Sequence, residues 1–219
     1  MFENIIKNVH NRHPLIHCIT NYVSINDCAN IVLACGGAPI MAEDINEVSQ
    51  ITSICQGLDI NIGMLNDNKL SSMLKAGATA NELGIPVILD PVGAGSSDYR
   101  IKAVQNLMSN VQFGVIRGNV SEIKAIAAKQ GIHNIAAGVY ETMQKNKSAM
   151  GVEAGIADKI TDDNIKEMAD FINKLSQKTG AVIAVTGGID MVADENRVYA
   201  IRNGHKMMSL VTGAGCQLS

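Results

Sequence analysis

Near the end of the chain, Gly213-Ala214-Gly215 is followed directly by Cys216. Glycines let successive backbone N–H groups point into one concavity, an arrangement that suits an anion. If a helix begins there, its N-terminus adds partial positive charge and favours loss of the Cys216 proton. The tetrapeptide alone leaves two interpretations open: an anion site with a reactive thiol, or an ordinary glycine turn with a buried one.

Two acidic residues are candidates for holding hydrated Mg²⁺. Asp90 ends the apolar run 85–90, and a carboxylate at the carboxyl end of a strand can bind this ion. Glu122 stands in Asn119-Val-Ser-Glu122, where Asn at the N-cap and Glu at N3 also predict a capping box that needs no metal. The two roles of Glu122 are compatible, and the sequence leaves both open.

Arg117 ends the apolar run 111–116, so its permanent charge suits a phosphate, or else a surface ion pair. The chain has neither the GxxxxGK[ST] pattern nor the GxGxxG fingerprint, so a bound nucleotide must use another scheme. His17 and Cys18 are neighbours in a predicted strand and point to opposite faces, which favours core packing over a nucleophile pair.

Composition narrows the class of protein. Apolar residues make up 47% and charged residues 18% of 219 residues, which excludes disorder and fits one large domain or two small ones. A net charge of −3 without a basic run argues against nucleic-acid binding, and no apolar run is long enough to span a membrane. Five cysteines without a CxxC pair, behind an N-terminus unlike a secretory signal, predict reduced thiols in the cytoplasm.

Short apolar runs alternate with helical patterns along the whole chain. We predict strands over 15–20, 38–41, 58–63, 85–90, 111–116 and 181–185. We predict helices over 27–35, behind Asn66 and Asp67, over 99–108, over 121–129, and from an N-cap at Thr161 to Gly180. Residues 191–203 predict an antiparallel hairpin at the sheet edge, and 131–159 has the weakest pattern, typical of a flexible excursion. The alternation predicts one α/β domain with a mostly parallel sheet covered by helices on both faces.

Ligands of open parallel sheets bind outside the carboxyl ends of the strands. The residues that follow the predicted strands are rich in polar groups and glycine: Asn21, Gly63, Asp90, Arg117 and Thr186. We therefore expect a functional site along one rim of the sheet, where the carboxyl ends of the strands lie.

Seven segments carry a resemblance, and they occur in one order: Asn21; Pro39-Ile-Met41; Asn61-Ile-Gly63; Asp90-Pro-Val-Gly-Ala; Arg117-Gly-Asn-Val-Ser-Glu122; Val185-Thr-Gly-Gly188; Gly213-Ala-Gly-Cys216. From about His13 to Ser219, the chain resembles the hydroxyethylthiazole kinase family of the ribokinase-like superfamily. Cys216 stands where sugar, hydroxymethylpyrimidine and pyridoxal kinases of the superfamily have Asp.

The resemblance implies a three-layer ribokinase-like domain over residues 1–219. It implies that MgATP phosphorylates the hydroxyl of 4-methyl-5-(2-hydroxyethyl)thiazole in thiamine biosynthesis and salvage. It also implies a homotrimer with thiazole pockets between subunits. The residues that match family positions are Met41 and Gly213 at the thiazole, with Asn21 and Gly63 beside them, Arg117 and Thr186 at ATP, Asp90 and Glu122 at magnesium, and Cys216 next to the reacting hydroxyl.

In this interpretation the amides of Gly213, Ala214, Gly215 and Cys216 receive the charge that develops on the γ-phosphate. Cys216 either accepts the hydroxyl proton or only orients the alcohol, and the sequence does not decide between them. Family members continue past Gly-Ala-Gly-Cys with a helix, whereas this chain stops at Ser219. We therefore expect it to lack the C-terminal helices and the dipole that completes the anion site.

Three alternatives stay open at this point. The first is a kinase for another vitamin precursor, hydroxymethylpyrimidine or pyridoxal, on the same fold. The second is a nucleotide-dependent lyase on the same scaffold. Cys216 in place of Asp argues against both of these relatives. The third is a non-catalytic vitamin-binding protein.

Overall fold

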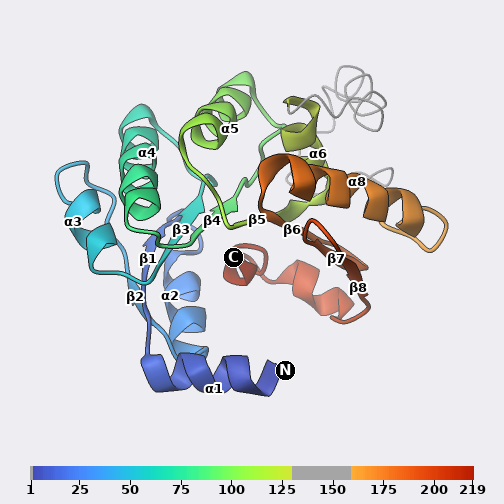
Figure 1. Ribbon diagram of the computed structural model, residues 1–219, viewed down its shortest axis with the longest axis horizontal. Coiled ribbons are helices and arrows are strands. Elements are labelled where there is room, and N and C mark those ends of the chain that lie inside the picture. Colours follow the sequence, from blue (N-terminus) through green and yellow to red (C-terminus); the bar gives the residue numbers. More distant parts are fainter. Residues whose placement is uncertain (1, 130–158) are drawn as a thin grey trace. The chain divides into compact units, whose positions relative to one another are not determined.

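The computed structural model describes residues 2–129 and 159–219 (Figure 1). The chain divides into two compact units. Unit 1 comprises Met1–Asp90, Leu107–Phe113 and Ser209–Ser219, and unit 2 comprises Pro91–Asn106 and Gly114–Met208. Of the predicted excursion over 131–159, residues 131–158 lie outside the described residues. That residues 1–219 form one kinase domain stays a prediction.

Unit 1 is built on four parallel strands in the order β2-β1-β3-β4. Their bounds are β1 Leu15–Ile19, β2 Ala38–Ile40, β3 Gly57–Asn61 and β4 Val87–Asp90. The helices of this unit are α1 Phe2–Arg12, α2 Ile25–Ala34, α3 Val48–Ser53 and α4 Asp67–Glu82, with a short 3₁₀ turn, η3, at Cys216–Leu218. In Figure 1, α2 lies on one side of these strands and α3 and α4 lie on the other.

Unit 2 combines a parallel strand pair with an antiparallel hairpin, in the order β5-β6-β7-β8. The strands are β5 Val115–Asn119, β6 Val182–Thr186, β7 Asp190–Ala193 and β8 Val198–Ile201. Its helices are α6 Val120–Lys129 and α8 Ile165–Thr179, while α5 Asp98–Asn110 and the 3₁₀ helix η2 Lys206–Leu210 have residues in both units. The predicted α/β class, the mostly parallel strands and the hairpin are confirmed.

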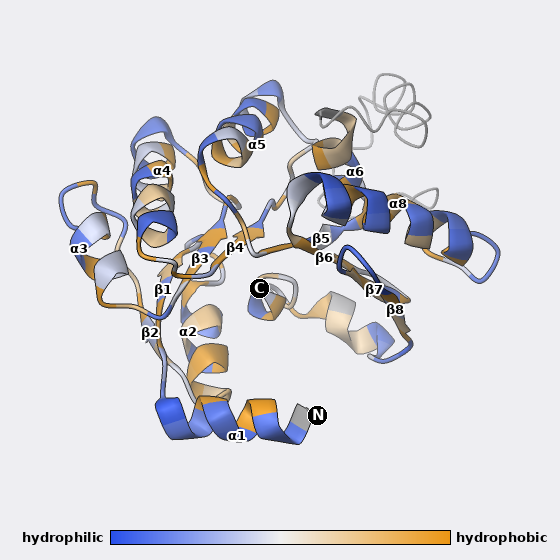
Figure 2. Ribbon diagram, in the orientation of Figure 1, coloured by the Kyte–Doolittle hydropathy of each residue, from blue (hydrophilic) through white to orange (hydrophobic). Residues whose placement is uncertain are grey.

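The strands supply the most deeply buried apolar side chains. Ile60 and Leu89 of unit 1 and Ile116 and Ile183 of unit 2 are fully buried, and Figure 2 shows the hydrophobic colouring concentrated on the strands. Burial on both faces is what a parallel sheet requires. Polar chemistry is therefore left to the strand ends and the loops that follow them.

The fifth strand begins later than its apolar run suggests. Residues 111–116 predict a strand, but β5 spans Val115–Asn119. Val111 instead packs on α4, where a Cβ added to Gly77 would lie 2.5 Å from the Val111 Cγ2. Arg117 is consequently inside the strand, not at its end.

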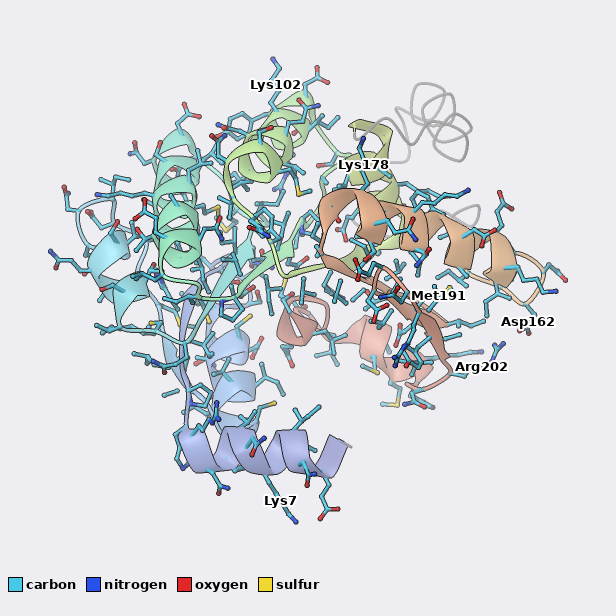
Figure 3. All side chains as sticks on the ribbon, in the orientation of Figure 1. Lys7, Lys102, Asp162, Lys178, Met191 and Arg202 are labelled. Atoms are coloured by element: carbon cyan, nitrogen blue, oxygen red, sulfur yellow. The ribbon has the colours of Figure 1, made fainter. Side chains whose placement is uncertain are left out.

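The start of α8 also differs from the prediction. Thr161 is not the N-cap, because the helix begins at Ile165 behind Asn164, whose Oδ1 accepts a hydrogen bond from the Thr161 N–H at 2.8 Å. Asp162 lies before the helix and forms an exposed ion pair with Arg202 at 2.6 Å (Figure 3), a kind of pair that contributes little to stability. The apolar stripe is confirmed by the burial of Met168, Ile172 and Leu175, and Gly180 ends the helix at φ +72°.

His17 of β1 is a fully buried core residue, as predicted. Its Nε2 lies 2.8 Å from the Ala42 carbonyl oxygen and its Nδ1 lies 2.9 Å from the Thr52 hydroxyl. A carbonyl only accepts, so in the neutral ring Nε2–H donates to Ala42 and Nδ1 accepts from Thr52. Burial lowers the pKa of His17, more than the Ala42 hydrogen bond raises it.

A histidine with a lowered pKa makes stability depend on pH. In the unfolded chain His17 gains a proton below about pH 6.5, whereas in the folded protein it stays neutral to lower pH. We expect the free energy of unfolding to fall as the pH drops below about 6.5, and to fall less in His17→Gln. Urea denaturation across this range measures it, with His205→Gln, at an exposed side chain, as control. Identical pH profiles for wild type and His17→Gln contradict this account.

Candidate active site

The strand ends of unit 1 carry three buried polar side chains that form a chain of hydrogen bonds. Asn21 follows β1, Asn61 ends β3 and Asp90 ends β4. The parallel register sets Asn61 beside Asp90. The Asn21 Nδ2 donates to Asn61 Oδ1 at 3.0 Å, and the Asn61 Nδ2 donates to Asp90 Oδ2 at 2.8 Å. Asn61 and Asp90 are both fully buried, so these bonds are sheltered from water.

The C-terminal segment of unit 1 meets both ends of this chain. Asn21 Nδ2 also donates to the Cys216 Sγ at 3.3 Å, and the Ser219 hydroxyl donates to Asp90 Oδ2 at 2.9 Å. The two hydrogens of an amide nitrogen can serve two acceptors at once. Three residues that the sequence singles out, Asn21, Asp90 and Cys216, are thus brought together, and Cys216 is half-buried.

At Gly63 and Gly213 the backbone lies so close to neighbouring residues that there is no room for a side chain. A Cβ added to Gly63 would lie 2.8 Å from the Asn21 Nδ2 and 2.9 Å from the Asn61 Oδ1. The Gly63 N–H itself donates to Asn61 Oδ1 at 2.9 Å. Gly213 has φ +78°, and a Cβ there would lie 2.9 Å from the Ser24 Cβ. Any side chain at either position would displace the neighbouring rim residues.

In the turn that ends in Cys216, not every backbone N–H group points into an open concavity. The Ala214 N–H donates to the Val211 carbonyl oxygen at 3.3 Å, so it is engaged within the turn. Gln217 N donates to Gly213 O at 3.0 Å, and the chain continues into the single turn η3. Met41 follows β2 and is half-buried.

In unit 2, Arg117 and Thr186 are brought together on neighbouring strands. The Arg117 Nη2 donates to the Thr186 Oγ1 at 2.8 Å, and Arg117 is only 8% exposed. Arg117 therefore does not lie at the surface, as the alternative of a surface ion pair requires. A buried guanidinium carries a strong requirement for acceptors, which suits the recognition of an anion.

Glu122 forms the predicted capping box at the start of α6. Its N–H donates to Asn119 Oδ1 at 2.9 Å, and its Oε2 accepts from the Asn119 N–H at 2.8 Å. The other oxygen, Oε1, accepts from the Gly93 N–H at 2.8 Å. A carboxylate has about four lone-pair sites, so capping leaves room for a further donor or a cation.

Sequence reasoning missed the central place of Asn61 and any role for Ser219 and Lys69. Asn61 stands in the segment Asn61-Ile-Gly63, and a polar residue that ends an apolar strand two residues before a glycine was the available signal. Lys69 carried no comparable signal, because the groups that it contacts are distant in the sequence.

Among the described residues all five cysteines are free; reduced thiols stay a prediction. Cys18, Cys28 and Cys55 are buried, and burial raises the pKa of each thiol. These three are accordingly unreactive core residues. In the described part of the chain no helix is long and apolar enough to cross a membrane.

Comparison with known proteins identifies close relatives. The sequence model of the hydroxyethylthiazole kinase family matches residues 6–219. A hydroxyethylthiazole kinase of Clostridium acetobutylicum is 52% identical over the whole of this chain, which covers 74% of that protein. One of Desulfovibrio desulfuricans is 45% identical over 99% of this chain and 70% of its own length.

A solved structure agrees with the sequence comparison. The structure of a hydroxyethylthiazole kinase from Pyrococcus horikoshii superposes with a TM-score of 0.81 at 32% identity, over 98% of this chain and 72% of that one. A ribokinase-like superfamily protein from Enterococcus faecalis, 11% identical with a TM-score of 0.55 over 93% of this chain and 67% of that one, shares the fold alone.

Proposed function

The chain belongs to the hydroxyethylthiazole kinase family, and from that premise we propose that it transfers the γ-phosphoryl group of ATP to the hydroxyl of 4-methyl-5-(2-hydroxyethyl)thiazole, in thiamine biosynthesis and salvage. The observation that carries the proposal within the structure is the buried hydrogen-bond chain from Cys216 through Asn21 and Asn61 to Asp90. It offers a thiol for the alcohol and a fixed carboxylate at the same rim.

The thiazole alcohol is assigned to the rim of unit 1. Asn21, Met41, Gly63 and Gly213 are its proposed contacts. Gly63 and Gly213 support this role because each lies where a side chain would collide with the rim. Backbone that must approach closely to neighbouring groups is typical of a site shaped for a small ligand.

ATP is assigned to Arg117 and Thr186, and Mg²⁺ to Asp90 and Glu122. Among the described residues no group of three or more His, Cys, Asp or Glu side chains could hold a metal by itself. Mg²⁺ is usually bound through one or two carboxylates, waters and the substrate's phosphates, and Asp90 and Glu122 each supply such a carboxylate. When bound, the ion would neutralise charge that develops on the phosphates.

The chain's own residues then position the reactants. Asn21 holds the Cys216 thiol through its amide N–H, and Cys216 either accepts the proton of the alcohol or orients it. The amides of Gly213–Cys216 are the proposed anion hole, although the Ala214 N–H would first have to leave the Val211 carbonyl. Phosphoryl transfer needs mainly such positioning and electrostatic stabilisation.

A homotrimer with thiazole pockets between subunits and a cytoplasmic location are further parts of the proposal. The apolar side chains of Tyr22 and Val23, next to Asn21, are largely exposed. Exposed apolar side chains are typical of interaction surfaces, which supports the proposal that a neighbouring subunit covers this rim. The free cysteines support a reducing compartment.

The proposed reaction is tested by ADP formation. We expect ADP only when the thiazole alcohol and Mg²⁺ are both present, with hydroxymethylpyrimidine as the competing alcohol. Light scattering on the same active sample measures the oligomeric state, which we expect to be a trimer. Equal turnover with hydroxymethylpyrimidine, or turnover that EDTA does not diminish, contradicts the proposal.

The role of Cys216 is tested by replacement. If Cys216 is the base, Cys216→Ala lowers kcat by about 10²–10⁴-fold, with KM for ATP unchanged, because positioned proton transfer contributes that much. A fall under roughly tenfold indicates that the thiol only orients the alcohol. Cys35→Ala, at an exposed free cysteine, is the matched control and should retain wild-type kcat.

Cys216→Asp separates the two roles further. A carboxylate with a reference pKa of ~3.9 is ionised at neutral pH, so an Asp at a base position should retain activity and extend it to lower pH. A folded Cys216→Asp protein that binds ATP but is inactive would refute the assignment of a base.

A further inference from the structure

The helix α4 carries a buried lysine that the proposed reaction does not use. Lys69 is 4% exposed. Asn66 caps α4 by accepting a hydrogen bond from the Lys69 N–H at 2.9 Å, so Lys69 lies in the first turn of the helix that follows β3. A charged ammonium buried to this extent must be paired with acceptors.

Lys69 finds its acceptors in two loops of unit 1. The Nζ donates to the Thr20 carbonyl oxygen and forms an ion pair with the Glu43 carboxylate at 2.8 Å. It also lies 4.6 Å from the centre of the Tyr22 ring, within the range of a cation–π interaction. Tyr22 in turn donates its hydroxyl to Glu43. Lys69, Glu43 and Tyr22 thus form a closed set, which we call the Lys69 cluster.

The cluster contacts the chain on both sides of Asn21 and shortly after Met41. Thr20 and Tyr22 are the two neighbours of Asn21, and Glu43 is two residues beyond Met41. One ammonium therefore connects the β1–α2 loop to the β2–α3 loop, and a movement of either loop would leave a buried charge without its partner. Such a movement is costly because the desolvated ammonium cannot recover its hydration.

The Glu43 carboxylate is held in its charged form by its partners. Burial alone would raise the pKa of Glu43, but hydrogen bonds from Lys69 and Tyr22 outweigh it and lower the pKa. The hydrogen bond to Glu43 raises the pKa of Tyr22, so its hydroxyl keeps the proton that it donates.

We infer that Lys69 is a positioning residue for the thiazole alcohol, because it fixes the two loops that carry Asn21 and Met41. The inference rests on the proposed function. It assigns to Lys69 an effect on binding of the alcohol and none on binding of ATP.

The test compares Lys69→Met with Glu43→Gln, using Lys102→Met as control. Lys102 is exposed on α5 (Figure 3). In Lys69→Met we expect KM for the thiazole alcohol to rise about tenfold, the equivalent of one lost positioned hydrogen bond, while KM for ATP changes less than about twofold. Glu43→Gln should shift KM in the same direction by less. Its side chain is 41% exposed, so this variant serves if Lys69→Met does not fold.

Hydrogen exchange supplies a second readout that needs no turnover. Backbone amides of residues 20–24 and 41–47 should exchange faster in both variants and at the wild-type rate in Lys102→Met. Unchanged exchange together with an unchanged KM for the alcohol overturns the inference, as does an equal rise of both KM values. If wild type does not phosphorylate the thiazole alcohol, the proposed function fails, and exchange alone then decides whether Lys69 orders the two loops.

Discussion

The side-chain amide of Asn61 is buried where it must accept and donate at once, and the rim of unit 1 is arranged around it. Its Oδ1 accepts from the Asn21 Nδ2 and from the Gly63 N–H, and its Nδ2 donates to Asp90. A flipped amide would set donor against donor twice, and a buried group left unpaired costs about 1–3 kcal/mol. The orientation of Asn61 is therefore fixed, and it fixes its neighbours. Asn21 Oδ1 must then accept from the N–H groups of Val23 and Ser24, which leaves Nδ2 for Cys216.

This order prepares the site before any ligand arrives. The donors and acceptors of the rim are aligned by the fold, so they need not reorganise when charge develops during the reaction. Gly63 is necessary because its N–H bonds to the amide and a side chain would push both asparagines away. Unit 2 uses the same principle behind β5, where the side chain of Glu122, in the first turn of α6, is fixed by two backbone N–H groups. The Lys69 cluster fixes the β1–α2 and β2–α3 loops in the same way, next to the buried amides.

Structure that depends on residues close together in the sequence could be predicted, whereas contacts between residues far apart in the sequence could not. The capping box followed from the spacing of Asn119 and Glu122, and the hairpin followed from its alternation. The start of β5 was misplaced because Val111 is apolar for packing on α4 rather than for a strand. Two helices, α1 and α3, were not predicted: α1 does carry apolar residues at helical spacing (Ile5, Ile6 and Val9), a signal that was overlooked, whereas α3 has only six residues, too few to show a period. The contacts of Asn61 with Asp90 and of Lys69 with Thr20 join residues that are 29 and 49 positions apart. No local pattern marks such pairs, which is why the seven ordered segments indicated the family but not how the rim is held.

The most direct measurement of this account is the coupling free energy between Asn21 and Asp90, which the side-chain amide of Asn61 joins directly through two hydrogen bonds. Urea denaturation of Asn21→Ala, Asp90→Asn and the double variant gives the coupling, and the same set in an Asn61→Ala background gives its dependence on the amide. We predict a coupling of about 0.5–3 kcal/mol, as for residues of one hydrogen-bond network, that disappears when Asn61 is replaced. Additive effects in the presence of Asn61, or an equal coupling in its absence, would contradict the central place of this amide.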